Sequence, residues 1–417
     1  MSKQNKKYMP KLRFPEFLAN PGWEGLYGNQ AFEQISDKDH NSDLPILAIT
    51  QEYGAIPREM IDYNVSVSEK SVQSYKVVDV GDFVISLRSF QGGIEYSEYK
   101  GLCSPAYVIL RSKKGVDKRF FKQYFKTQSF IRDLTKNLEG LRDGKIISYK
   151  KFSEVLLPKP SLEEQRKIAD CLSSIDELIE AEGEKLDELK AHKKGLVQQL
   201  FPSNGKTVPQ LRFPEFQNDK GWMREELFNI LDKIIDYRGK APPKAEIGVP
   251  LITAKNVRSG WLDMSCDEYI AADKYESWMS KGMPKAGDIL FTTEAPLGHV
   301  AFFPSDGKFA LGQRILTLRT KPEKCIPEFL FQSLLGPQMQ NEINFNSTGS
   351  TAKGIKSSVF SRIGFCYPEI PEQRKIASFL SSIDKLILSE AKKVEKLKEY
   401  KKGLMQQLFP SIEGVDL

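Results

Sequence analysis

The sequence predicts an α+β protein in which two pseudo-symmetric mixed α/β domains are joined by two long antiparallel coiled-coil helices. Three observations lead to this prediction: parts of the sequence occur twice along the chain, each copy ends in a heptad pattern, and short strand-like runs precede each heptad pattern. The 417 residues are 40% hydrophobic and 28% charged, as in an ordinary globular protein. This composition argues against a disordered chain, a collagen-like fibre and a membrane protein.

The repetition is clearest at the ends of each copy. Residues 10–17 recur with one change as residues 209–216, and residues 163–203 align without a gap to residues 371–411, with 27 of 41 positions identical. Units of this length are domains and not solenoid repeats. Near-identical frames around different inserts indicate a fixed scaffold that presents two different surfaces.

Inside the inserts only a skeleton is shared. Gly-Asp occurs at residues 81–82 and 287–288, and Leu-Arg occurs at residues 110–111 and 318–319. The strand-like runs are short and rich in Val, Ile, Phe or Thr, which is typical of a mixed α/β domain. The predicted order is 1–28, an N-terminal repeat segment; 29–160, the first variable domain; 161–202, a long helix; 203–227, a linker repeating the N-terminal segment; 228–368, the second variable domain; 369–410, a second long helix; and 411–417, a tail.

Each long helix carries an apolar seam whose spacing alternates between four and three residues, which is the signature of a coiled coil. Ser161 is the predicted N-cap of the first helix, and Pro202 and Pro410 end the two helices. The helix-seam residues are Ile168, Leu172, Ile175, Ile179, Leu186, Leu189 and Leu196 in the first helix, and Ile376, Leu380, Ile383, Ile387, Val394, Leu397 and Leu404 in the second.

The charges of the two helices favour pairing them with each other. Segment 163–203 has a net charge of −4 and segment 371–411 has a net charge of +4. An antiparallel pair could set Glu182 opposite Lys401, and the mirror-related Lys193 opposite Glu390. The alternative is that these four charges lie at solvated edges of the seam.

The repeated Gly-Trp pairs at residues 22–23 and 221–222 predict packing anchors and not platforms for stacking bases. Because residues 10–23 precede the first insert as residues 209–222 precede the second, we expect residues 10–23 to pack near the end of the second helix and residues 209–222 near the end of the first.

The chain resembles the specificity subunit of a type I restriction–modification system. That family has two variable target-recognition domains, each followed by a long helix that begins with Glu-Gln-x-x-Ile-Ala. The motif stands here at residues 164–169 and again at residues 372–377. The resemblance covers essentially the whole chain, and the doubling of the motif at this spacing makes it specific.

The resemblance implies a non-catalytic subunit that binds an asymmetric, bipartite target in double-stranded DNA. It implies that the helices act as a spacer and as the docking platform for two methyltransferase subunits, and that up to two restriction subunits join the complex. No cofactor is expected in this chain: S-adenosylmethionine belongs to the methyltransferase, and ATP and Mg²⁺ belong to the motor-nuclease subunit. The assembled complex would then have adenine-specific DNA methyltransferase and type I endonuclease activity.

Polar loops after the strand-like runs supply the candidate DNA-binding residues. Arg and Lys suit guanine, Asn and Gln suit adenine, and hydroxyl groups suit phosphates. The alternative for each residue is a solvated surface position. The candidates are Arg88, Ser89, Gln91, Arg142, Lys145 and Lys150 in the first domain, and Lys255, Asn256, Arg258, Thr293, Gln313, Arg314, Ser350, Lys353 and Lys356 in the second.

Catalytic functions find little support in the sequence. The three histidines are far apart and none of the five cysteines forms a Cys-x-x-Cys pair, so we expect neither a metal site nor a catalytic residue. Scattered cysteines and no secretory signal favour the cytoplasm. The alternative function is a pseudo-symmetric protein–protein adaptor or inhibitor that does not read DNA sequence; a stand-alone endonuclease would require Mg²⁺-dependent cutting by this chain alone.

Overall fold

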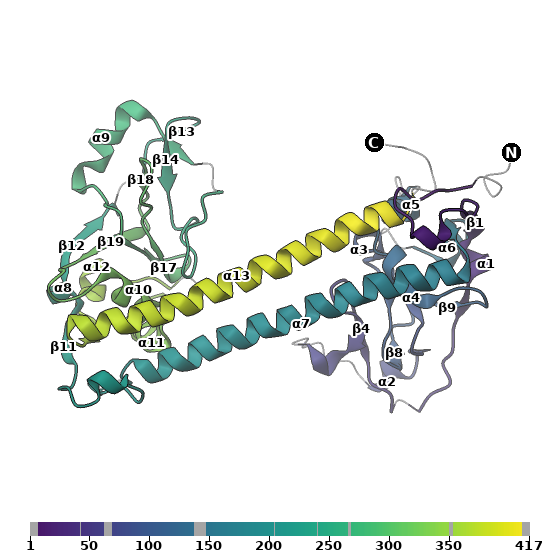
Figure 1. The fold of residues 1–417 in the computed structure, drawn as a ribbon, viewed down its shortest axis with the longest axis horizontal. Coiled ribbons are helices and arrows are strands. Elements are labelled where there is room, and N and C mark those ends of the chain that lie inside the picture. Colours follow the sequence, from purple (N-terminus) through teal and green to yellow (C-terminus); the bar gives the residue numbers. More distant parts are fainter. Residues whose placement is uncertain are drawn as a thin grey trace. The chain divides into compact units, whose positions relative to one another are not determined.

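The structure is a computed structural model that describes residues 7–41, 43–61, 69–136, 147–203, 205–239, 241–265, 268–349 and 353–410. The chain forms two compact units (Figure 1): unit 1 comprises Met1–Gly183 and Lys392–Leu417, and unit 2 comprises Glu184–Ala391. The unit boundaries fall inside the two long helices, α7 (Leu162–Leu200) and α13 (Ile370–Leu408), so each unit contains one half of each helix. Among the described residues, no helix is both long enough and apolar enough to cross a membrane.

Unit 1 is built on a four-stranded antiparallel sheet in the order β2-β9-β6-β7, with three further two-stranded sheets, β1-β10, β3-β4 and β5-β8. Its elements other than the long helices are η2 (Pro15–Phe17), β1 (Glu24–Tyr27), α1 (Gly28–Ala31), β2 (Phe32–Ile35), β3 (Leu47–Thr50), β4 (Gly54–Pro57), η3 (Arg58–Met60), α2 (Glu69–Val72), β5 (Lys76–Val78), β6 (Phe83–Ile85), α3 (Ser89–Gly92), β7 (Glu95–Tyr96), β8 (Gly101–Cys103), β9 (Val108–Ser112), α4 (Lys118–Tyr124), α5 (Gln128–Thr135), α6 (Tyr149–Ser153) and β10 (Leu156–Lys159).

Unit 2 repeats this plan. Its four-stranded sheet has the order β12-β19-β16-β17, β11 pairs with β20, and a second sheet has the order β13-β15-β14-β18. Its elements other than the long helices are η4 (Pro214–Phe216), β11 (Met223–Glu226), α8 (Leu227–Ile230), β12 (Leu231–Asp236), β13 (Lys244–Ala245), β14 (Val249–Ile252), β15 (Tyr269–Ile270), η5 (Ala272–Lys274), α9 (Tyr275–Trp278), η6 (Met279–Lys281), β16 (Ile289–Thr293), β17 (Leu297–Phe302), β18 (Ala310–Leu311), β19 (Ile315–Thr320), α10 (Pro327–Leu335), α11 (Pro337–Phe345), α12 (Ser357–Phe360) and β20 (Gly364–Tyr367).

The skeleton shared by the inserts is one ion pair between neighbouring strands. In unit 1, Arg111 on β9 donates to both carboxylate oxygens of Asp82 at 2.8 and 2.7 Å. In unit 2, Arg319 on β19 donates to Asp288 in the same way at 2.9 and 2.6 Å. Both aspartates are buried in the turn before the adjoining strand, β6 or β16. Because a buried carboxylate requires a partner, the Gly-Asp and Leu-Arg pairs of the sequence are retained together.

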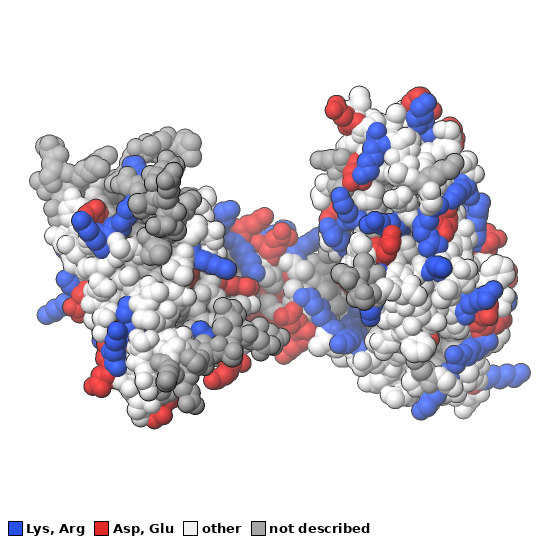
Figure 2. Space-filling model, turned by 180° about the vertical axis from the view of Figure 1, so that it is seen from behind, with Lys and Arg blue, Asp and Glu red and all other residues white. Residues whose placement is uncertain are grey.

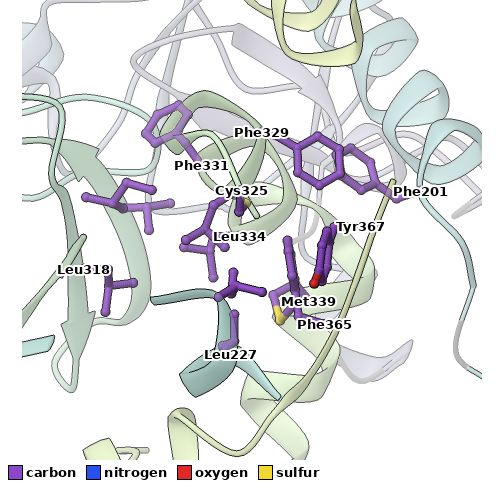
Figure 3. Packing of buried hydrophobic residues seen from close by; sticks show 14 of the residues in the cluster. Phe201, Leu227, Leu318, Cys325, Phe329, Phe331, Leu334, Met339, Phe365 and Tyr367 are labelled. Carbon is purple, nitrogen blue, oxygen red and sulfur yellow. The ribbon is translucent and has the colours of Figure 1, made fainter. Parts of the chain in front are cut away.

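The cores join the repeated frame to each insert. In unit 2, Phe201, which follows α7, packs against Phe329 of α10 with ring centroids 5.3 Å apart, and Phe365 and Tyr367 of β20 complete the cluster (Figure 3). In unit 1, Phe409, which follows α13, packs in the same way against Phe120 of α4 at 5.3 Å. Since these rings come from the ends of the long helices, each insert is anchored on the frame by aromatic packing.

The repeat segments pack as the sequence predicts. In unit 1 the Leu12 amide donates to the Gln407 carbonyl near the end of α13, and in unit 2 the Leu211 amide donates to the Gln199 carbonyl near the end of α7, each at 3.0 Å. Trp23 and Trp222 are both buried in the adjoining cores. The interpretation of these two tryptophans as packing anchors is confirmed.

Candidate nucleic-acid interface and its framework

The Glu-Gln-x-x-Ile-Ala motif is a clamp, and its glutamate holds the repeat segment. Glu164 accepts two hydrogen bonds from the Arg13 guanidinium, each 2.7 Å, and the two side chains are 1% and 5% exposed. The same guanidinium also donates to the Asn20 and Pro21 carbonyls. The hydrogen bond to Glu164 is the main reason that the pKa of Arg13 is raised. The clamp therefore fixes the fold of the segment that leads into the first insert.

Unit 2 contains the same clamp. Arg212 donates to both oxygens of Glu372 at 2.8 and 2.7 Å, and to the carbonyls of Asp219 and Lys220. The Trp222 indole nitrogen adds a third donor to Glu372 at 3.3 Å. The glutamate of the repeated motif therefore holds the repeat segment in the same way in both units.

The glutamine of the motif holds the insert. The Gln165 side chain accepts a hydrogen bond from the Asp117 amide at the N-terminus of α4 and donates to the Pro160 carbonyl. Gln373 accepts from the Ile326 amide at the N-terminus of α10 and donates to the Lys324 and Pro368 carbonyls. Both glutamines are buried. The buried glutamine therefore holds each insert to the helix through backbone groups of the insert. This contact does not depend on which side chains the insert carries.

In each unit the two long helices run antiparallel and are joined by equivalent charges. In unit 1, Asp176 of α7 accepts from Lys401 of α13 at 2.6 Å and from Gln123 of α4 at 2.8 Å. In unit 2, Asp384 of α13 accepts from Lys193 of α7 at 2.6 Å and from Gln332 of α10 at 2.8 Å. We call each set a junction triad: lysine and aspartate join the two helices, and glutamine joins them to the insert.

The predicted register of the helix pair is wrong. Glu182 pairs with Lys393 instead of Lys401, and Glu390 pairs with Lys185 at 2.9 Å instead of with Lys193. Lys401 and Lys193 are taken by the aspartates of the junction triads. The physical reason is that each aspartate also satisfies a glutamine of the insert, which the helix sequences alone do not show. The predicted seam residues themselves are all buried or half-buried.

The candidates of the first domain that precede β7 lie on the single helical turn of α3 or directly before it. Arg88 and Gln91 are exposed, whereas Ser89 is 1% exposed and its hydroxyl accepts the Ser86 amide at 2.9 Å. Ser89 therefore supports the turn and does not present its hydroxyl to solvent. The turn ends at Gly93, whose φ is +83° and where an added Cβ would lie 2.0 Å from the Phe125 carbonyl oxygen. Only glycine fits this position.

An ion pair with a buried carboxylate lies beneath this turn. Glu95 is 2% exposed and accepts from Lys126 at 2.5 Å, and Lys126 also donates to the Gly92 and Gln51 carbonyls. Burial raises the pKa of Glu95, and Lys126 offsets that effect only in part. The ion pair fixes the backbone that carries Arg88 and Gln91. Lys150 is exposed on α6, while Arg142 and Lys145 lie outside the described residues.

The first candidate loop of the second domain follows β14. Lys255 and Arg258 are exposed at its surface, where they pair with Glu268 and Asp263. Asn256, in contrast, is 1% exposed and its side chain is used within the loop: it accepts from the Thr253 amide and hydroxyl and donates to the Asp263 carbonyl. The structure thus gives Asn256 the role of holding the loop that presents the two cations.

Three other candidate segments of the second domain meet at the end of β16. The Ile355 amide donates to the Thr293 carbonyl, the Thr293 amide donates to the Arg314 carbonyl, and Glu294 pairs with Arg314 at 2.9 Å. Thr293 is 1% exposed, so its hydroxyl supports the strand end. Arg314, Lys353 and Lys356 are exposed and Gln313 is half-buried; Ser350 lies outside the described residues.

Two basic residues that the sequence did not single out adjoin this cluster. Arg238 follows β12 and donates to the Ile355 carbonyl at 3.1 Å, between Lys353 and Lys356 along the chain. Lys281 donates to the Asp236 and Arg238 carbonyls. We call the half-buried Arg238 and the exposed Lys281, Arg314, Lys353 and Lys356 the basic track of unit 2. No sequence pattern indicates Arg238 and Lys281, because the contact of Arg238 with the Ile355 carbonyl and of Lys281 with the Arg238 carbonyl depends on the fold.

The charged surface is mixed in sign. On the face shown in Figure 2, Lys and Arg side chains lie beside Asp and Glu side chains, with uncharged areas between them. This pattern agrees with the formal net charge of only +6. Attraction to a polyanion would therefore depend on positioned cations such as the basic track and not on one large positive field. Among the described residues, no group of three or more His, Cys, Asp and Glu side chains could hold a metal ion.

Comparison with known proteins places these features in a family. The model of the type I restriction modification DNA specificity domain matches residues 28–191 and 225–399. The chain is 25% identical over 425 residues to the type I restriction enzyme MjaVIII specificity subunit of Methanocaldococcus jannaschii, covering 97% of this chain and 95% of that protein. It is 23% identical over 278 residues to the type I restriction enzyme EcoKI specificity subunit of Escherichia coli K12, covering 64% of this chain and 59% of that protein.

Two solved structures share the fold. The type I restriction–modification S subunit of M. genitalium superposes with a TM-score of 0.56 at 14% identity, over 96% of this chain and 99% of that one. A chain from a study of complex assembly and conformational transition of the type I R-M system gives a TM-score of 0.54 at 16% identity, over 94% and 98% of the two chains. At these identities the likeness establishes the fold alone.

Proposed function

The chain belongs to the type I restriction–modification DNA specificity family, and from this premise we propose that it reads an asymmetric, bipartite DNA target with one target-recognition domain for each half. The observation that carries the proposal is the contrast within each unit. The clamps and junction triads are the same in both units, whereas the loops that present cations differ: one turn around Arg88 in unit 1, and the basic track in unit 2. Two unlike polar surfaces on equal frames suit two unlike half-sites.

The second part of the proposal concerns protein partners. The helix pair is the docking platform for two methyltransferase subunits, and restriction subunits join through that assembly. Leu178 of α7 and Leu386 of α13 support this part: they are equivalent positions of the repeat, and they are 44% and 58% exposed. An exposed leucine at the same place in each unit suits one copy of the same partner per unit.

The third part concerns chemistry. The chain supplies recognition, and catalysis belongs to its partners: S-adenosylmethionine would bind the methyltransferase, and ATP and Mg²⁺ the motor-nuclease subunit. Support comes from the way in which this chain uses its candidate polar residues. Asn256, Thr293 and Ser89 hold loops, and Glu164 and Glu372 hold the frame.

The test is a selection experiment with the full chain and its methyltransferase partner on a pool of random duplexes. We expect enrichment of one bipartite sequence. The logarithm of the association constant should fall linearly as the logarithm of the salt concentration rises. Substitutions at Arg88 and Gln91 should then relax one half of the target, and substitutions at Arg314 the other half. Binding that shows no sequence preference would favour the protein–protein adaptor instead.

A second arm separates docking from DNA binding. A chain with Leu178→Lys and Leu386→Lys should lose co-purification with the methyltransferase and keep its salt-dependent binding to DNA. Lys190→Ala is the matched control, because Lys190 is an exposed position of α7 whose ion-pair partner, Asp187, is also exposed. Normal co-purification of the double variant would contradict docking at these leucines.

A further inference from the structure

Unit 2 contains a cavity of ≈ 370 Å³ at one end of the basic track. Its walls come from the segment after β12 and from α9 and η6, and they include Tyr237, Arg238, Ser277, Trp278, Ser280 and Lys281. None of these residues is used by the clamps or the junction triads. The combination of two cations, two hydroxyl groups and an aromatic wall calls for a chemical explanation.

The aromatic wall is fixed and its polar atoms are already used. The Tyr237 and Trp278 rings stack with centroids 5.6 Å apart and an interplanar angle of 26°. The Tyr237 hydroxyl donates to the Gly282 carbonyl at 2.7 Å, and the Trp278 indole nitrogen donates to the Leu311 carbonyl at 2.9 Å. Because both aromatic donors are satisfied inside the protein, this wall offers an apolar surface but no free N–H or O–H donor for the edge of a base.

The two cations, in contrast, use only some of their N–H donors inside the protein. An ammonium group has three protons, and Lys281 gives two of them to the Asp236 and Arg238 carbonyls. A guanidinium group has five N–H donors, and Arg238 uses Nε and one proton of Nη2 on Asp236 and one proton of Nη1 on the Ile355 carbonyl. The remaining protons can serve a ligand with several acceptor oxygens.

Asp236 is the acidic group in contact with these cations. Burial acts to raise the pKa of Asp236, but the hydrogen bonds from Arg238 outweigh that effect and the pKa is lowered overall. The nearby Glu276 of α9 lies beside Lys308, 3.6 Å away. Two cations and one carboxylate give the cavity a net positive charge, so an anion is favoured there.

We propose that this cavity binds a phosphodiester group of the DNA backbone beside the half-site read by the second domain. The chemistry favours a phosphate, since Lys and Arg side chains are groups that contact phosphate oxygens in protein–DNA complexes. Of the two serines, Ser277 already donates its hydroxyl to the Lys274 carbonyl. Position favours it as well, because Arg238 is hydrogen-bonded to the segment that carries Lys353 and Lys356. The inference rests on the proposed DNA-binding function and assigns to the cavity the role of positioning the duplex.

The test measures binding of the full chain to a fluorescent duplex of mixed sequence over a series of salt concentrations. Lys281→Gln removes one phosphate contact, so the slope of log K against log salt should become shallower by about 0.9. Ser280→Asp adds a negative charge at the exposed mouth of the cavity and should weaken binding several-fold at low salt. Ser305→Asp is the matched control, because Ser305 is an exposed serine of the same unit that does not line the cavity.

The outcomes separate the two proposals. If the wild-type chain and the Ser305→Asp variant bind equally and Ser280→Asp and Lys281→Gln behave like them, the phosphate assignment is wrong and DNA binding stands. If the wild-type chain does not bind duplexes at any salt concentration, both proposals fall. Circular dichroism checks that each variant is folded. Inorganic phosphate at constant ionic strength should not displace the duplex; displacement by millimolar phosphate would identify a free-phosphate site and overturn the assignment to DNA.

Discussion

At the scale of single residues, the strongest constraint is the buried pair of Arg13 and Glu164. Replacing Arg13 by Ala leaves a carboxylate that is 1% exposed without its bidentate partner. We expect unit 1 to lose about 3–5 kcal/mol of unfolding free energy, as is usual when one member of a buried ion pair is removed. The loss can be measured by chemical denaturation, with hydrogen exchange of the unit 1 amides as the readout of unfolding.

The repeat supplies the control for this prediction. Arg212→Ala should destabilise unit 2 to a similar extent, because Arg212 and Glu372 have the same geometry. Lys7→Ala, which removes the exposed pair with Glu24, should change stability by less than about 1 kcal/mol. An Arg13→Ala chain as stable as the Lys7→Ala chain would contradict the clamp.

Glu95 predicts a pH dependence of unit 1. Its pKa in the folded chain is raised above the ordinary value of 4.5, so between that value and the folded pKa the folded state binds more protons than the unfolded state. The stability contributed by this group is fully present below pH 4.5 and is lost as the pH rises through the folded pKa. Glu95→Gln should remove this slope from urea denaturation midpoints measured across the window. Glu98→Gln is the control, because the Glu98 carboxylate is 61% exposed.

Residues also show where sequence-based prediction of the site reaches its limit. The residue types and positions of the candidate loops indicate the exposed cations, but they indicate Ser89, Asn256 and Thr293 for the same reason, and these three side chains are buried. A polar side chain in a loop either faces solvent or satisfies its own backbone, and both choices give the same residue types. For Asn256 a signal existed: an asparagine that follows a threonine by three residues at a strand end is typical of a self-supporting turn.

At the scale of elements, the junction triads determine how the long helices pair. Opposite net charges predicted the partner helix, and the antiparallel direction is present in both units. The register could not be predicted, because it depends on Gln123 and Gln332 from the inserts. Periodicity identifies which residues form a seam, but many registers bury the same seam. The hydrogen bond from a glutamine of the insert to the aspartate of the helix pair favours one of these registers.

The triads predict a charge-exchange experiment. Asp176→Lys and Lys401→Asp should each destabilise unit 1 by about 1 kcal/mol, since both side chains are partly exposed, at 41% and 18%. The double variant should regain most of that loss because the attraction is restored with reversed sign. Thermal unfolding by circular dichroism is the measurement. Exchange of Asp187 and Lys190, which are 78% and 53% exposed, is the control and should change little.

At the scale of the whole molecule, unit 1 is assembled from two separate stretches of chain, whereas unit 2 is one continuous stretch. The sequence predicted two variable domains and two helices as separate parts, whereas the compact units divide each helix between them. The repeat revealed that the parts come in pairs. It could not reveal that residues 392–410 complete the core of unit 1, because that depends on contacts between residues far apart in sequence, such as Phe409 with Phe120 and Tyr124.

This arrangement predicts a long-range effect of one substitution. Phe409→Ala, near the C-terminal end of the described chain, should cost about 3–5 kcal/mol of stability and should act on residues of unit 1. Hydrogen exchange should accelerate in α4 and in the β2-β9-β6-β7 sheet and stay unchanged in the β12-β19-β16-β17 sheet. Phe201→Ala should produce the converse pattern. Equal acceleration in both sheets for either variant would show that the two cores are not independent.

The division of the long helices also has a consequence for synthesis. As the nascent chain leaves the ribosome, residues 184–391 emerge in one continuous run, so unit 2 has all of its parts before unit 1 does. Until residues 392–410 have been synthesised, the aromatic core of the first insert lacks the part of α13 and the Phe409 ring that cover it. Translation from the N-terminus therefore completes unit 2 first, and in the interval the first insert exposes apolar surface that is prone to aggregation.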